Sequence, residues 1–238
     1  SNNSINLDIL KRLRYIYGSI ITEEKTLGYA KQINELIYNY KSKSAFEKKS
    51  ESWSEKTILL ITYADNINKG VSGKTLEDFT SFYKKYFSNF IDTIHFLPFF
   101  TSSSDGGFSV KNHEEIDPVF GSWEDIKKIS QNTNIMTDLV LNHASSQGKW
   151  FKNFIENKDP GQDYFFTVNE SYDCSKVIRP RDHNLLKEVK FKNGSKTLWC
   201  TFSYDQIDLN FKNPDVLLEF IKLIIKFSSY GIKIFRLD

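Results

Sequence analysis

The sequence predicts an α/β protein built from parallel β-α-β units. Four short apolar runs at 57–65, 91–100, 134–143 and 232–238 have the length and composition of strands, and the first is unbroken, as is typical of a strand buried on both faces. Amphipathic helical segments separate these runs. Such alternation favours a parallel sheet, and both a doubly wound sheet and a (β/α)8 barrel are compatible with it.

The composition is that of a folded chain. Hydrophobic residues make up 39% and aromatic residues 15% of the 238 residues, which excludes a disordered or collagen-like protein. The 32 basic and 30 acidic side chains leave a net charge of +2, which argues against nucleic acid as a partner. No apolar run approaches the ~18 residues of a membrane helix, and two cysteines are too few for a disulfide framework. We therefore expect a cytoplasmic protein with no nucleic-acid or membrane partner.

The first half of the chain shows clear helix signals. Two amphipathic helices are expected within 5–40, with Thr22 as the N-cap of the second, and the Lys-rich segment 41–56 is expected to be a solvated linker. A further helix is expected from Thr75. Another should begin after Ser122, because an acidic residue follows it three positions later in the pattern of a capping box.

The second half departs from simple alternation. A polar, aromatic-containing stretch of about sixty residues follows the third predicted strand. A helix is then expected at 214–229, capped by Asn213 and begun by Pro214. Gly231 ends it, and the apolar run that follows predicts a final strand in the core.

Polar side chains gather at the carboxyl ends of the predicted strands, where reactive groups collect in parallel α/β folds. Asp105 follows the second strand, His143 ends the third, and Arg236 and Asp238 end the fourth. Each also has a structural interpretation. Asp105 precedes two glycines and could form a turn, and His143 could be a satisfied strand-end histidine. Arg236 and Asp238 are two residues apart on one strand face and could form a structural ion pair.

Two of these strand ends resemble the signatures of the α-amylase-type glycoside hydrolase family. The run DLVLNH at 138–143 is similar to the D-x-x-x-N-H signature, and FRLD at 235–238 is similar to the R-x-D signature that ends on the nucleophile. Further segments resemble the sucrose phosphorylase branch, most of all glucosylglycerate and sucrose-type phosphorylases: LITYAD at 60–65, the loop at 97–110, 117–126, RPR at 179–181 and QIDLNF at 206–211. The resemblance extends from about residue 7 to 238.

The resemblance implies the N-terminal half of a (β/α)8 TIM barrel, with strands 1–4, a B-domain insertion after strand 3 and an N-terminal helical extension. The implied divisions are the helical extension and linker at 1–56, the first part of the barrel at 57–147, the insertion at 148–210, and the barrel helix and strand 4 at 211–238. We therefore expect a fragment cut at the nucleophile. Open sheet edges would lead such a chain to form a homodimer or to aggregate.

The resemblance also implies roles for individual side chains. Asp238 would be the catalytic nucleophile, and Arg236 would keep it ionised and oriented. The glucosyl unit and phosphate would be bound by the remaining predicted site residues, Asp105, Phe108 and His143 for the sugar and Arg181 for phosphate or an acceptor hydroxyl. A planar guanidinium suits phosphate because it can bind two oxygens at once.

The implied activity is that of a retaining α-glucosyl phosphorylase acting on sucrose or a glucosylglycerate-like α-glucoside. Inorganic phosphate would be the co-substrate, with no cofactor and no metal. The family's acid/base Glu belongs to a later strand, so we expect the 238-residue chain to be inactive alone. The alternatives are a hydrolase or transglucosidase of the same family, or a truncated sugar-binding protein that has lost catalysis.

Overall fold

The computed structural model describes residues 5–43, 53–70, 73–179 and 181–238. The chain divides into two compact units, one made of 1–52 and 211–229 and the other of 53–210 and 230–238. Most of the predicted linker (44–52) and Pro180 of the RPR motif lie outside the described residues.

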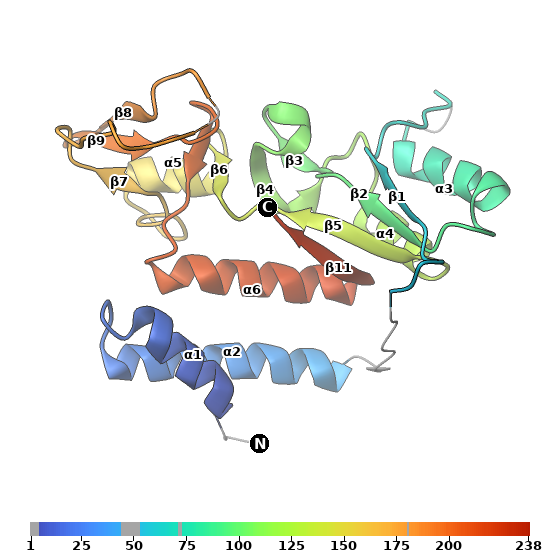
Figure 1. The fold of residues 1–238 in the computed structure, drawn as a ribbon, viewed down its shortest axis with the longest axis horizontal. Coiled ribbons are helices and arrows are strands. Elements are labelled where there is room, and N and C mark those ends of the chain that lie inside the picture. The colour runs from blue at the N-terminus through green and yellow to red at the C-terminus, as the bar shows by residue number, and fades with distance from the viewer. Residues whose placement is uncertain (1–4, 44–52, 71–72, 180) are drawn as a thin grey trace. The chain divides into compact units, whose positions relative to one another are not determined.

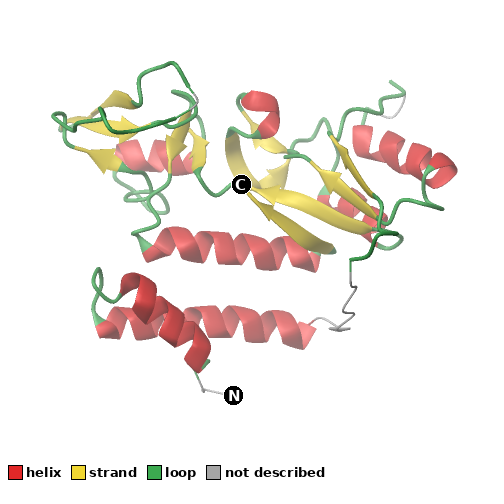
Figure 2. Cartoon of the chain, in the orientation of Figure 1, coloured by secondary structure: helices red, strands yellow, loops and turns green. Residues whose placement is uncertain are grey.

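The first unit contains three helices, α1 (Leu7–Tyr17), α2 (Glu23–Lys43) and α6 (Pro214–Ser229), which confirms the helices expected at 5–40 and 214–229 (Figure 2). The Tyr17 hydroxyl donates to the carbonyl oxygen of Phe211 over 2.8 Å, so it joins the first helix to the segment before α6. The buried core of this unit draws on all three helices and comprises Leu10, Leu13, Tyr17, Ala30, Ile33 and Leu218.

The second unit is built on a parallel four-stranded sheet, which confirms the predicted fold class. Its strands are β1 (Leu59–Thr62), β2 (Thr93–Phe96), β5 (Asn134–Leu139) and β11 (Ile232–Leu237), in the order β1-β2-β5-β11 (Figure 1). The helix α3 (Thr75–Tyr86) follows β1, and α4 (Trp123–Ser130) precedes β5. The predicted capping box of α4 is present, with the Asp125 carboxylate accepting from the Ser122 backbone over 2.8 Å.

The two outer strands of the sheet are less buried than the sequence predicted. The first and last apolar runs were expected to be buried, yet Ile61 on β1 is 58% exposed and Leu237 on β11 is 65% exposed. Both strands lie at edges of the four-stranded sheet, so each has a paired neighbour on one side only. The central strand β2, in contrast, is buried along its whole length.

The sixty-residue stretch after β5 forms elements of its own. It contains the helix α5 (Lys149–Glu156) and an antiparallel sheet of β7 (Thr167–Val168), β9 (Gly194–Trp199) and β8 (Leu186–Phe191). The short strand β10 (Gln206–Asp208) pairs antiparallel with β6 (His143–Ser145). This pairing places residues 206–208 beside the end of the third barrel strand.

The loop after β2 is also ordered by pairing. The strands β3 (Phe100–Ser102) and β4 (Val110–Ile116) pair antiparallel and enclose a short 3-10 turn at Asp105–Gly107. Among the described residues, no helix combines the length and apolarity needed to cross a membrane.

Candidate active site

The Arg236 guanidinium connects two carboxylates at the carboxyl end of the sheet. Its Nη1 lies 2.7 Å from Asp238 Oδ1 and also donates to Asp138 Oδ1. Arg236 and Asp138 are register partners on the adjacent parallel strands β11 and β5. The hydrogen bond to Asp138 is the main cause of a raised pKa of Arg236, and Asp238 adds to it, so the guanidinium remains charged beside both carboxylates.

Asp138 has a second partner that the motif comparison did not single out. His95, on the central strand β2, places Nε2 2.7 Å from Asp138 Oδ2. Both side chains are almost fully inaccessible, at 5% and 0% exposure. A buried carboxylate needs such partners, because a charge removed from water without them is costly. His95 lies in an apolar run that the sequence predicts to be a strand, and this was the available signal for it. Its pairing with Asp138 could not be read from the sequence.

The loop that carries Asp105 has an unusual backbone. Asp105 and Gly106 both have φ of +58°, and Gly107 has φ of +98°. Only glycine adopts such values readily, and Asp is one of the few other residues that tolerate them. A side chain at Gly107 would press on the carbonyl oxygen of Pro98, so this glycine permits close approach of the loop to the end of β2. Asp105 is therefore in a turn, as its structural interpretation proposed, and it also has a partner across the site.

That partner is Gln206 on β10. Its Nε2 donates to Asp105 Oδ2 over 2.7 Å and lies 3.1 Å from His143 Nε2. Gln206 is 2% exposed, so its amide has little access to water. The structure thus brings together Asp105 and His143, two of the predicted sugar-binding residues, through a glutamine that was part of the quoted QIDLNF run but was not assigned a role.

His143 also contacts Phe108, through the main chain. His143 Nε2 lies 3.1 Å from the carbonyl oxygen of Phe108, which can only accept, and 3.1 Å from the amide nitrogen of Gln206, which can only donate, so the tautomer of the ring decides which of the two contacts is a hydrogen bond. The ring Nδ1 lies 3.3 Å from the Asn142 amide nitrogen, which also can only donate. Burial lowers the pKa of His143, and the Phe108 carbonyl together with nearby carboxylates, Asp238 among them, offsets this only in part. At neutral pH the ring is therefore uncharged.

Arg181 is connected to the same cluster through an aromatic ring. Its guanidinium lies 5.5 Å from the centre of the Phe202 ring, and that ring lies 5.2 Å from the His143 ring. Stacking on an aromatic face leaves the planar edge of a guanidinium available for hydrogen bonds. Phe202 was not predicted, because it precedes β10 in an irregular segment without a motif.

The six predicted site residues all lie in the second unit, and direct or one-residue contacts group them into two separate networks. Asp238 and Arg236 belong to the His95–Asp138 network. The others, Asp105, Phe108, His143 and Arg181, belong to the network around Gln206 and Phe202. Among the described residues, no group of three or more His, Cys, Asp or Glu side chains could hold a metal ion.

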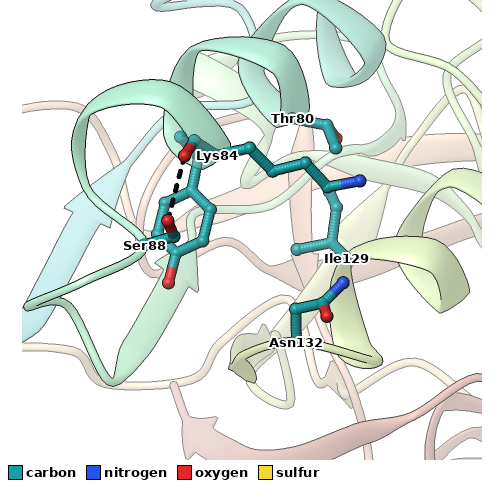
Figure 3. A pocket seen from close by; sticks show the side chains of 6 residues that line it. Thr80, Lys84, Ser88, Ile129 and Asn132 are labelled. Carbon is teal, nitrogen blue, oxygen red and sulfur yellow. Dashed lines mark hydrogen bonds between the residues drawn. The ribbon is translucent and has the colours of Figure 1, made fainter.

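A separate hollow of about 390 Å³ lies on the helical side of the second unit (Figure 3). It contains none of the predicted site residues. The Ser88 hydroxyl at its wall donates to the carbonyl oxygen of Lys84 over 2.9 Å, so part of its polar lining is already satisfied. The lining residues come from α3, α4 and the turns that follow them: Thr80, Tyr83, Lys84, Ser88, Ile129 and Asn132.

Comparison with known proteins agrees with these motifs. The model of the alpha-amylase catalytic domain family matches residues 85–238. A glucosylglycerate phosphorylase from Allomeiothermus silvanus is 36% identical over 230 residues, covering 97% of this chain and 40% of that protein. A glucosylglycerate phosphorylase from Escherichia coli is 34% identical over 226 residues, covering 94% of this chain and 39% of that protein. The crystal structure of a sucrose 6F-phosphate phosphorylase from Thermoanaerobacter thermosaccharolyticum matches with a TM-score of 0.71 at 30% identity, over 81% of this chain and 41% of that one.

The chain therefore belongs to the alpha-amylase catalytic domain family. The similarity to the phosphorylase branch that the motifs predicted is confirmed, as is the fold class of a partial (β/α)8 barrel. The chain spans about 40% of the length of these curated relatives.

Proposed function

We propose that this chain supplies the nucleophile and part of the glucosyl-binding site of a retaining α-glucosyl phosphorylase. The observation that carries the proposal is the Arg236 guanidinium bound to both Asp138 and Asp238 at the carboxyl end of β11. This arrangement holds the Asp238 carboxylate in place beside a fixed positive charge. The similarity to glucosylglycerate phosphorylases supports the same activity and favours a glucosylglycerate-like α-glucoside as donor, with sucrose as the second choice.

In the proposed reaction an Asp238 oxygen attacks the anomeric carbon as the bond to the leaving oxygen breaks. A carboxylic acid on the opposite face of the sugar gives its proton to that oxygen; in retaining enzymes the two carboxyl groups are about 5–5.5 Å apart. We assign no residue of this chain to the acid. Phosphate then forms a new bond to the anomeric carbon while the bond to Asp238 breaks, and the acid regains its proton from the phosphate. The products are α-glucose 1-phosphate and the free acceptor.

The second network would bind the two reactants. Asp105 and the neutral imidazole of His143 can accept from and donate to sugar hydroxyls, and such bonds accelerate the reaction when they strengthen in the transition state. Phe108 would provide an apolar surface for the ring. Arg181, held against Phe202, would bind phosphate oxygens. We further propose a cytoplasmic location, which the two free thiols at Cys174 and Cys200 support.

The test is release of α-glucose 1-phosphate from glucosylglycerate or sucrose, with and without inorganic phosphate. It should be run on this chain, for which we expect no turnover, and on any longer polypeptide that contains the sequence, for which we expect phosphate-dependent turnover. Asp238→Asn should abolish the turnover, and Asp173→Asn, at an exposed turn, should leave it unchanged. Release of glucose at the same rate without phosphate would instead identify a hydrolase.

A further inference from the structure

One carboxylate outside the predicted site collects an unusual number of hydroxyl donors. Asp205, directly before β10, lies within hydrogen-bond distance of five serine hydroxyls on two segments that are distant in sequence. Those near Oδ2 belong to Ser103 at 2.5 Å, Ser104 at 2.7 Å and Ser109 at 2.8 Å, and those near Oδ1 belong to Ser145 at 3.2 Å and Ser146 at 2.8 Å. The motifs gave no role to Asp205 or to these serines.

Because Asp205 is ionised, it can only accept hydrogen bonds from these serines. Partial burial would raise its pKa, but the serine hydroxyls outweigh that effect and lower the pKa to about 2. An ionised carboxylate only accepts, so Ser104, Ser109 and Ser146 direct their hydroxyl hydrogens toward it. The Ser103 and Ser145 hydroxyl oxygens lie 2.6 Å apart, so one of these two donates to the other while the remaining one donates to Asp205. Hydrogen bonds to an ionised acceptor are stronger than those between neutral groups.

The positions of the serines show what the carboxylate holds. Ser103 and Ser104 directly precede the turn at Asp105–Gly107, and Ser109 directly follows Phe108. Asp205 therefore forms hydrogen bonds to both ends of the loop that contains Asp105 and Phe108. Ser145 is the last residue of β6, the strand that begins with His143, and Ser146 follows it. The same carboxylate therefore joins the loop to that strand.

The loop needs such an anchor because its own backbone is unfavourable. Asp105, Gly106 and Gly107 are three consecutive residues with positive φ, between +58° and +98°. A short run of this kind has many alternative conformations when it is released, since glycine is conformationally permissive. The next residue after Asp205, Gln206, binds Asp105 itself, so two adjacent residues hold the loop at its ends and at its centre.

We propose that Asp205 is a positioning residue that locks the loop 104–108 onto β6, so that Asp105, Phe108 and His143 keep the geometry that binds the transferred glucosyl unit. The structural part of this inference stands on the contacts of Asp205, and its link to the glucosyl unit rests on the proposed function.

The first experiment measures the loop in the 238-residue chain by amide hydrogen exchange. Asp205→Ala should accelerate exchange of residues 103–110 by at least about tenfold, and Asp205→Asn, which keeps one acceptor oxygen, by less. The matched control is Asp173→Asn, whose carboxylate accepts from the backbone and hydroxyl of Ser175 in an exposed turn and should change loop exchange by less than about twofold. Unchanged exchange in Asp205→Ala, or equal acceleration across the whole second unit, would overturn the proposal.

The second experiment asks whether Asp205 acts through Asp105, in a polypeptide containing this sequence that catalyses phosphorolysis. Asp205→Ala should lower kcat/KM for the glucosyl donor by at least about tenfold in the parent and by less than about twofold when Asp105→Ala is already present. Equal losses in both backgrounds would show that Asp205 does not act through this loop. If the parent shows no phosphorolysis, the proposed function fails, and the exchange measurement still decides whether Asp205 holds the loop.

Discussion

Replacing Arg236 with Met should destabilise the second unit by about 2–3 kcal/mol, because it leaves a buried carboxylate behind. Asp138 is fully inaccessible, and its partners are His95 at 2.7 Å and Arg236. Removing one partner of a fully buried ion pair costs about 3–5 kcal/mol, but the Arg236 side chain is 44% exposed and His95 remains, so the loss should be about 2 kcal/mol. Asp238 also loses its partner, but its side chain is 26% exposed and water replaces part of that contact, which adds about 0–1 kcal/mol.

The assay is urea unfolding followed by tryptophan fluorescence. All four tryptophans of the chain lie in the second unit, so the signal reports on that unit and not on the helices α1, α2 and α6. The fluorescence midpoint and slope then give the free energy of unfolding for each variant.

Two companion variants make the reasoning refutable. Asp138→Asn removes the buried charge instead of leaving it unpaired, and its amide can still bond to both neighbours, so it should cost less than Arg236→Met, about 1–2 kcal/mol. Lys158→Met removes an exposed partner of Glu156 and should leave the free energy of unfolding almost unchanged. If Arg236→Met falls within about 0.5 kcal/mol of Lys158→Met, or costs less than Asp138→Asn, the argument from buried charge is wrong.

Three further predictions concern pH, backbone and phosphate binding. Burial lowers the pKa of His113 to about 3, below its ordinary value of 6.5, so the unfolded chain binds a proton that the folded chain does not. Stability should therefore fall by up to about 1.4 kcal/mol per pH unit as pH drops from 6.5 toward 3, and urea titrations at pH 7 and 5 should show a smaller fall for His113→Phe. Gly107→Ala should destabilise the second unit by at least about 2 kcal/mol and Gly106→Ala by about 1 kcal/mol, because only the first puts a methyl group against a carbonyl oxygen; equal losses in urea would contradict this. Phe202→Leu should raise the KM for phosphate about three- to tenfold by removing the face on which Arg181 stacks, and an unchanged phosphate KM would exclude that role.

Local chemistry determined the fold class and the starts of several helices. Alternating apolar runs predicted the parallel strands, and caps predicted helix starts. Ser122 with Asp125 forms the expected capping box, and Asn213 accepts from the backbone of Asp215 over 2.9 Å at the start of α6. These features depend on residues a few positions apart, so they can be read directly from the sequence.

The apolar runs alone did not show which strands would lie at the edges. Ile61 and Leu237 belong to runs that look like buried strands, yet both side chains are largely exposed. An apolar run favours the strand conformation, whereas its burial depends on what lies on each side of it in the sheet.

The motifs determined the candidate residues, but only the tertiary structure decided how they are connected. His95 and Asp138 are 43 residues apart, and Gln206 and Asp105 are 101 residues apart, so neither contact has a sequence spacing that could predict it. Parallel pairing of β2 with β5 brings His95 beside Asp138, and antiparallel pairing of β6 with β10 places Gln206 beside the strand that begins with His143. The sequence by itself determined a half-barrel with reactive groups at its strand ends. The pairing of those strands decided that one network holds Asp238 and another holds the loop at Asp105, since buried polar groups take whichever partners the packed chain places beside them.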